Sequence, residues 1–179
     1  MRKIISICTL LLLVTAFSVK AQSNVAYVDS EYVLKHIPEY NSAITELDKL
    51  SDQWQKEVDA RYEEIEKLYS AYQQDQPRLS EQLRQRRENE IIEREKQVKD
   101  FQRQKFGFEG DLFKERERLI KPIQDKVTSA IQAVANEGSI DLILDKNSES
   151  SFLFANPKLD KSNEVITKLG YSPNSSLAN

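Results

Sequence analysis

The sequence predicts an α+β protein in which a long antiparallel helical hairpin stands on a small β-rich body. Three observations support this prediction: helical spacing of apolar residues over two long segments, a very polar stretch with a proline between them, and short strand-like segments near both ends. Charged residues make up 31% of the 179 residues and hydrophobic ones 39%, with only four glycines. This composition is typical of a helix-rich, solvent-exposed protein rather than a compact enzyme.

The first 21 residues have the features of a secretory signal peptide, which the mature protein would lack. Arg2 and Lys3 precede an apolar run over residues 4–19, and Val19–Ala21 ends at a cleavage site. The alternatives are an uncleaved membrane anchor, for which the run is short, and a lipoprotein, for which Cys8 lacks a small residue before it. Cleavage would remove the only cysteine and three of the 26 basic residues; with all 29 acidic residues retained, the net charge becomes −6.

Residues 22–40 are expected to form the first part of the body. Residues 24–29 are rich in good strand formers and read as a short strand. Asp29 or Ser30 can cap the short helix that follows. Pro38 suits the first turn of the next helix, where its missing N–H is not needed.

Residues 41–121 are expected to form the helical hairpin, with its tip near residues 73–78. Pro77 should end the first helix by pushing Gln76 out of the helical conformation. Pro122 should kink or interrupt the returning helix. In the first helix, seven of the nine heptad seam positions are apolar: Ile44, Leu47, Trp54, Val58, Ile65, Leu68 and Tyr72.

Two further features of the hairpin bear on its pairing. Residues 41–77 carry a net charge of −5 and residues 78–121 a net charge of +3, which favours antiparallel contact. Gly107 and Gly110 should weaken the returning helix by about 1 kcal/mol each relative to alanine.

Residues 122–171 are expected to complete the body with a helix, a β-hairpin and a short helix, and residues 172–179 to form a flexible tail. Three strands leave exposed edges, so a closed oligomer is expected rather than a monomer. The residues predicted to build the oligomer body are Val25, Tyr27, Ile140, Leu142, Leu144, Phe152 and Phe154.

We expect no enzyme activity, no metal and no cofactor. No glycine-rich phosphate loop follows a strand, and no serine–histidine or metal-ligand spacing is present. His36 is the only histidine and is interpreted as a packing or surface residue. Nucleic acid is not an expected partner, because the mature chain is acidic and lacks stacking aromatics beside its arginines.

The helical hairpin carries more aromatic side chains than one narrow seam can bury, which indicates a binding surface. The alternative for the aromatic residues is that they simply pack at the edges of the seam. The alternative for the arginines near the tip is that they only keep the end of the hairpin solvated. The candidate binding residues are Tyr62, Tyr69, Tyr72, Phe106, Phe113, Arg84, Arg86 and Arg87.

The segments VAYVDSEYVLKHIPEY, SIDLILDKNSESSFLFANP and LDKSNEVITKLGY, together with the signal peptide and the charged hairpin, resemble the Skp/OmpH family of periplasmic chaperones in order and spacing. The resemblance implies a homotrimer with a β-rich body and three helical tentacles around a cavity. It also implies an ATP-independent holdase that keeps unfolded outer-membrane β-barrel proteins soluble in the periplasm.

This sequence differs from the best-known members of that family, which are strongly basic. Its mature net charge of −6 leaves only the arginines near the tip to provide a local positive field. These arginines could also make a peripheral contact with a membrane surface. The alternative function is that of an exported structural coiled-coil scaffold or spacer of the cell envelope.

Overall fold

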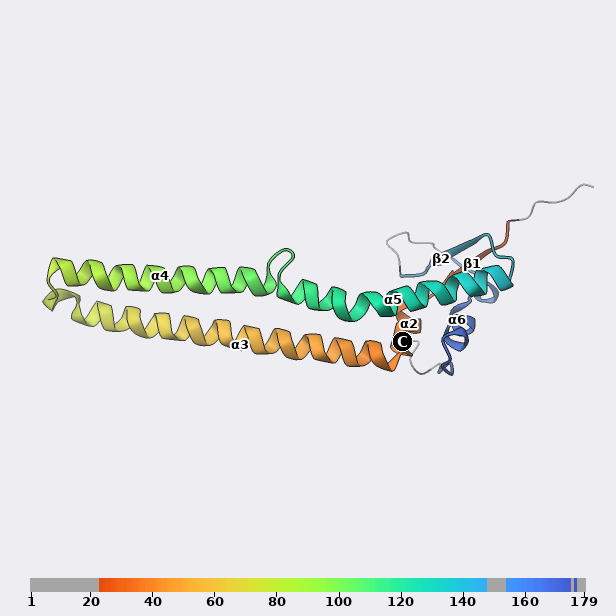
Figure 1. Ribbon diagram of the computed structural model, residues 1–179, viewed down its shortest axis with the longest axis horizontal. Coiled ribbons are helices and arrows are strands. Elements are labelled where there is room, and N and C mark those ends of the chain that lie inside the picture. The colour runs from red at the N-terminus through yellow and green to blue at the C-terminus, as the bar shows by residue number, and fades with distance from the viewer. Residues whose placement is uncertain (1–22, 148–153, 175, 177–179) are drawn as a thin grey trace, which may run out of the picture.

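The computed structural model describes residues 23–147, 154–174 and 176, and the molecule has two parts (Figure 1). A long hairpin of helices forms an arm, and a small body of strands and short helices lies at its base. Long helices with a small strand pair fit the predicted α+β class. The predicted signal peptide, residues 1–21, lies outside the described residues. In chain order the elements are β1 (Val25–Val28), α2 (Ser30–Lys35), α3 (Pro38–Asp75), η1 (Gln76–Arg78), α4 (Glu81–Phe106), α5 (Asp111–Glu137), β2 (Leu142–Asp145), η2 (Pro157–Leu159) and α6 (Ser162–Lys168).

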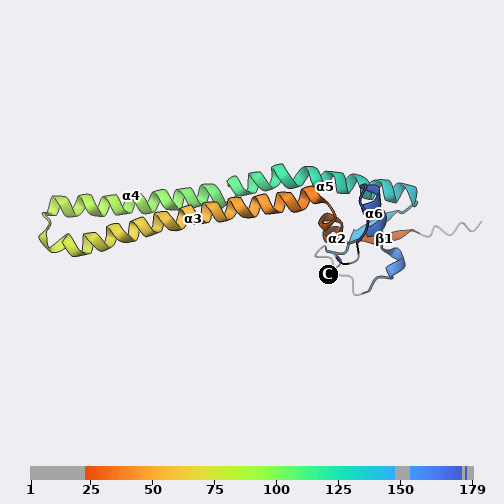
Figure 2. The ribbon, with the colours of Figure 1, turned by 90° about the horizontal axis from the view of Figure 1, so that it is seen from below.

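The arm has α3 on one side and α4 followed by α5 on the other, and the two sides stay close together in both views (Figures 1 and 2). The chain reverses in a tight 3₁₀ turn at Gln76–Arg78. Gln76 itself stays helical, contrary to prediction, because its N–H still donates to the carbonyl of Tyr72. The next helix then starts at a serine cap: Oγ of Ser80 accepts a hydrogen bond from the N–H of Leu83 at 3.4 Å.

A narrow apolar seam holds the two sides of the arm together. Most of its members recur at heptad spacing, as expected for an antiparallel pair of helices. Leu68, Leu79, Phe101 and Phe106 pack along its sides. The buried members of the seam are Val58, Ile65 and Tyr72 from α3 and Ile91 and Val98 from α4.

The break in the returning side of the arm falls at residues 107–110, and α5 runs unbroken through Pro122. The prediction of an interruption at Pro122 is therefore wrong. The proline is exposed to solvent, while its neighbours Ile120 and Ile123 are buried in the body. An interior proline costs a helix about 3 kcal/mol, and burial of the opposite face of α5 offsets this cost.

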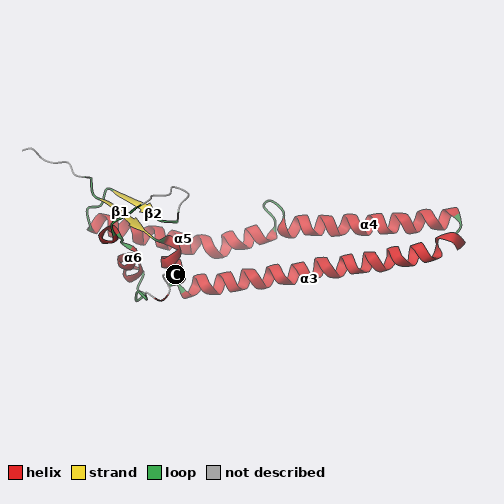
Figure 3. Cartoon of the chain, turned by 180° about the vertical axis from the view of Figure 1, so that it is seen from behind, coloured by secondary structure: helices red, strands yellow, loops and turns green. Residues whose placement is uncertain are grey.

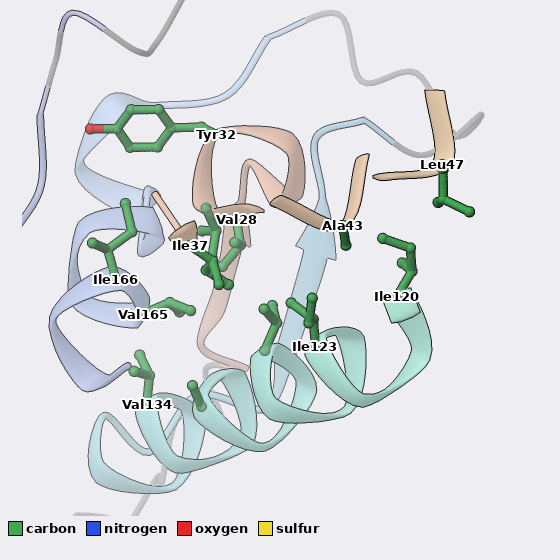
Figure 4. Packing of buried hydrophobic residues seen from close by; sticks show 13 residues of the cluster. Val28, Tyr32, Ile37, Ala43, Leu47, Ile120, Ile123, Val134, Val165 and Ile166 are labelled. Carbon is green, nitrogen blue, oxygen red and sulfur yellow. The ribbon is translucent and has the colours of Figure 1, made fainter. Parts of the chain in front are cut away.

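The second half of α5 is the platform on which the body is built (Figure 4). Strand β1 contributes Val28, helix α6 contributes Val165 and Ile166, and the start of α3 contributes Leu47 to the same cluster. Val165 and Ile166 are completely buried although α6 has only seven residues. The short helices are thus stabilised by tertiary packing rather than by their own length.

Within the described residues, the sheet of the body is a parallel pair of β1 with β2. The turn of the predicted β-hairpin and most of its second strand fall in residues 148–153, outside the described residues. Val25 pairs with Leu142 and Val28 with Asp145. A parallel pair needs a long crossover, and here the whole helical arm is that crossover. Figure 3 shows both strands at the body end of the molecule, beside α5.

The second strand of the predicted hairpin is not found where the structure describes the chain. Phe152 lies outside the described residues. Phe154 lies within them, but it belongs to no strand and is 83% exposed. Within the described ranges, the further strand-like pairing is a single parallel bridge between Tyr27 and Asp160.

The end of the chain is fastened to the base of the arm, at least as far as Asn174. The Tyr171 hydroxyl donates to Oε2 of Glu39 at 2.9 Å, and the Asn174 N–H donates to Nε2 of His36 at 2.8 Å. Asn174, which lies within the predicted tail, thus contacts the base of the arm. His36, interpreted from the sequence as a packing or surface residue, is buried.

Candidate functional site

The described part of the chain offers neither a metal centre nor a membrane span. Across residues 23–147 and 154–174, no cluster of three or more histidine, cysteine, aspartate or glutamate side chains could hold a metal ion. Within those ranges, no helix has both the length and the apolar character needed to cross a membrane. Two surfaces with exposed apolar side chains, one on the arm and one on the body, are the candidate sites.

Two of the predicted tyrosines lie on one exposed flank of the arm. Tyr62 and Tyr69 are one heptad apart on α3 and so share a face beside the seam. Tyr69 is 51% exposed, and Ile92 on α4 is 62% exposed. The register of the hairpin, set by the contact between Tyr72 and Glu88, places Ile92 near the level of Tyr69 on the same flank. Tyr62, Tyr69 and Ile92 are therefore apolar side chains that the fold itself does not cover.

Tyr72 does not belong to that exposed surface, because the structure buries it in the seam. Its hydroxyl donates to the carboxylate of Glu88 and accepts a hydrogen bond from Nε2 of Gln76 at 3.2 Å. The hydrogen bond to the Glu88 carboxylate, together with burial and the negative charge, raises the pKa of Tyr72. Tyr72 thus joins the two helices near the tip.

The arginines near the tip have different surroundings. Nε of Arg84 donates to the carbonyl of Gln76 at 3.2 Å, so this half-buried side chain fastens the turn. Arg86 and Arg87 are exposed, and Arg87 lies 3.8 Å from Glu90 on the same helix. Of the three predicted binding arginines, Arg86 and Arg87 present their charge to solvent.

Aromatic side chains at the end of α4 pack against α3 and are partly buried there. Phe106 stacks edge-on against Trp54 of α3, with ring centroids 6.2 Å apart. Nζ of Lys105 lies 4.7 Å from the centroid of the Trp54 ring, and the guanidinium of Arg61 lies 4.1 Å from that of Phe101. Such cation–π contacts between the helices contribute to the arm. The predicted site residue Phe106 is therefore half-buried.

Two phenylalanines just beyond this point are exposed. Phe113, a predicted site residue, is exposed on the first turn of α5. Phe108 is 96% exposed in the loop between α4 and α5. Phe108 is not among the candidate binding residues predicted from the sequence, because its spacing continues the apolar series of the returning helix that includes Val98 and Phe101. The flanking Gly107 and Gly110 were the available signal that this phenylalanine lies in a loop.

Among the described residues, few ion pairs join the two oppositely charged sides of the arm. The ion pair between Arg118 of α5 and Glu46 of α3, at 3.5 Å, does join the two sides. Several other pairs on the arm link residues three or four apart in one helix, such as Arg61 with Glu57. Exposed pairs of this kind contribute little to stability, so the apolar seam and the cation–π contacts set the pairing.

The second candidate surface is the outer face of the sheet. Ile143 packs against the core, so its neighbours Leu142 and Leu144 point away from it. Leu142 is 50% exposed, and Val25 and Leu144 are also exposed. Val25, Leu142 and Leu144, which are predicted to build the oligomer body, thus lie on the exposed face of the sheet and not in the core of the single chain. Of the remaining predicted body residues, Tyr27 and Ile140 are half-buried.

The protein is thus elongated and helix-rich. Its helical arm is the crossover between the two parallel strands of a small body, and both parts expose apolar side chains. The chain belongs to the OmpH-like family of outer membrane proteins, whose family model matches residues 24–169. Among solved structures it is similar to an OmpH-like protein from Caulobacter crescentus CB15, described as a candidate outer membrane chaperone. The TM-score is 0.65 at 12% identity, and the match covers 83% of this chain and 85% of that one. No curated protein matches the sequence.

Proposed function

We propose that the protein is an ATP-independent periplasmic holdase that binds unfolded outer-membrane β-barrel proteins and prevents their aggregation. The observation that carries this proposal is the exposure of three apolar side chains, Tyr62, Tyr69 and Ile92, on one flank of the arm. The seam between the helices is already filled by other side chains, so this flank is available to a partner. Membership of the OmpH-like family supports the same function.

The proposed mechanism is weak, multivalent capture. An exposed tyrosine or isoleucine contributes a small, non-directional contact that many apolar segments can satisfy. Several arms around one cavity would raise the effective concentration of such contacts for a single client chain. No bond is made or broken in this mechanism, so neither a nucleotide nor a metal is needed.

The proposed assembly is a homotrimer held together by the body. Val25, Leu142 and Leu144 form an exposed apolar face on the sheet, and Phe154 adds an exposed aromatic residue nearby in sequence. A closed symmetric assembly would remove this face and the sheet edges from water. The arms would then extend from one body and enclose the cavity. Arg86 and Arg87 near the tips are proposed to contact acidic client segments or a membrane surface.

The test is light scattering of a urea-unfolded outer-membrane β-barrel protein after dilution, with and without the mature protein. Suppression of scattering at near-stoichiometric amounts, with no effect of added ATP, is the expected result. Suppression that requires ATP would contradict the proposed mechanism. No suppression in either case would leave the scaffold or spacer role as the better account.

A further inference from the structure

The loop between α4 and α5 is an ordered turn closed by its own hydrogen bonds. The N–H of Gly107 donates to the carbonyl of Arg103 at 2.8 Å, and that of Gly110 donates to the carbonyl of Gly107 at 2.9 Å. Helix α5 restarts at once, with the N–H of Lys114 bonded to the carbonyl of Gly110 at 3.1 Å. Figure 1 shows this loop projecting from the arm between α4 and α5.

The two glycines of the GFEG sequence are required for this geometry. A Cβ atom at position 107 would lie 2.3 Å from the carbonyl oxygen of Arg103, and one at position 110 would lie 2.9 Å from that of Gln104. Real side chains do not approach backbone so closely, so glycine is needed at both positions. Glu109 between them adopts the left-handed conformation, with φ of 53°, which costs free energy for a residue with a Cβ.

The base of the loop is braced from both sides. Nζ of Lys105, at the end of α4, lies 2.6 Å from Oδ2 of Asp111, the first residue of α5. The same ammonium group lies against the ring of Trp54 on α3. The side chains of Lys105 and Asp111 are both largely shielded from solvent, so this pair is screened less than a surface ion pair. The loop is therefore held in one place relative to the arm.

What this braced loop displays is one phenylalanine. Phe108 is 96% exposed, whereas Phe101 and Phe106, on the preceding turns of α4, pack against the seam. An aromatic ring that stays exposed contributes no burial of apolar surface to the stability of the folded monomer. A strained backbone held by specific glycines and an ion pair, and carrying an unused apolar side chain, indicates a contact residue.

The size of the contact indicates its occupant. A phenylalanine buries about 150–250 Å², whereas each partner in a stable interface between folded proteins buries about 800 Å². Phe108 alone cannot hold a folded partner, but it suits brief contacts with a flexible chain. We propose that Phe108 is a contact point for apolar and aromatic side chains of an unfolded client. This inference rests on the proposed holdase function and assigns it a residue.

The test compares Phe108→Ser with Phe108→Leu in the light-scattering assay, using the full mature protein. The serine variant should need about tenfold more protein for half-maximal suppression, as expected for loss of one good apolar contact. The leucine variant should stay close to the parent, because it keeps an apolar side chain. Both should melt at the parental temperature, since Phe108 packs against nothing in the monomer.

A photo-crosslinking amino acid at position 108 provides the direct readout. It should crosslink the unfolded β-barrel protein and lose that crosslink once the client has folded. Crosslinks between two copies of this chain would instead show an arm-to-arm contact and overturn the inference. A serine variant that suppresses aggregation as well as the parent would also overturn the inference. The same holds for a serine variant with a melting temperature below that of the parent. A parent that fails to suppress aggregation contradicts the proposed function itself, which separates the two failures.

Discussion

Nε2 of His36 accepts a hydrogen bond from the backbone N–H of Asn174 at 2.8 Å. This role leaves Nδ1 as the donor to the Tyr32 carbonyl, also at 2.8 Å. The ring of His36 also packs edge-on against that of Tyr32, with centroids 4.5 Å apart. The buried imidazole thus connects α2 to the C-terminal segment, just before the chain enters α3.

Replacement of His36 by phenylalanine should release the C-terminal segment without unfolding the body. The ring remains to pack against Tyr32, but the acceptor for the Asn174 N–H is lost. A hydrogen bond contributes a net 1 kcal/mol or so, which corresponds to about fivefold faster exchange of that amide. Hydrogen exchange monitored by NMR measures this change. Unchanged exchange at Asn174, or faster exchange throughout α6, would contradict the assignment.

Asp29 should make the stability of the body depend on pH in the acidic range. Burial alone would raise the pKa of Asp29, but hydrogen bonds from Tyr32, Lys146 and Asn147 outweigh it, and the pKa lies below the usual 3.8. The contribution is fully present above the unfolded-state value and is lost as pH falls through the folded-state value. Asp29→Asn should therefore cost about 1–2 kcal/mol at pH 7.

At a pH well below the folded-state pKa of Asp29, the same variant should match the parent, because the parent carboxylate is then protonated and has lost its negative charge as well. Thermal melting of both proteins at neutral and acidic pH, at one protein concentration, measures the difference. A constant difference at all pH values would show that the amide disturbs packing rather than charge. Asp48→Asn, on an exposed face of α3, is a matched control that should show no such effect.

The arm could be predicted from the sequence because its signals are local and periodic. The heptad of α3 and the polar stretch around Pro77 each depend on neighbours a few residues away. The position of the break in the returning side of the arm, at residues 107–110, could not be predicted from local signals in the same way. Pro122 carries the stronger local signal, but burial of Ile120 and Ile123 by distant parts of the chain decides that α5 continues.

The body was harder to predict because its pairing is not local. Leu142, Ile143 and Leu144 are all apolar, so the sequence cannot tell which face of the strand meets the core. That choice depends on β1, more than a hundred residues earlier in the chain. The candidate site shows the same limit. Heptad spacing places Tyr62 and Tyr69 beside the seam, and Gly107 and Gly110 indicate a loop, but the backbone of that loop decides that Phe108 is exposed.

The arm and the body should lose stability separately, because their buried clusters are distinct. Ile65 belongs to the cluster of the arm and Ile166 to that of the body. Replacement of either by alanine should cost about 2–5 kcal/mol locally. Hydrogen exchange should rise in α3 and α4 for Ile65→Ala, and around α6 and β1 for Ile166→Ala. If either variant accelerates exchange equally in both regions, the two parts fold as one cooperative unit.

Leu142→Asp should dissociate the proposed trimer while leaving each subunit folded. Leu142 is 50% exposed in the single chain, so an aspartate there stays solvated. In the assembled body the same charge would be buried without a partner, which costs several kcal/mol. Ile143→Asp is the matched control, because Ile143 packs against the core and its replacement should unfold the subunit. Sedimentation and circular dichroism together distinguish folded monomers from unfolded chains.

Charge reversal at the tip should have the opposite outcome. Arg86 and Arg87 are exposed at the far end of the arm, so the double change Arg86→Glu with Arg87→Glu should alter folding by less than about 0.5 kcal/mol. The trimer should stay whole, and only client capture should change. A Leu142→Asp protein that remains a full oligomer would exclude the outer face of the sheet as the assembly surface. A tip variant that falls to monomers would show that the arms hold the subunits together.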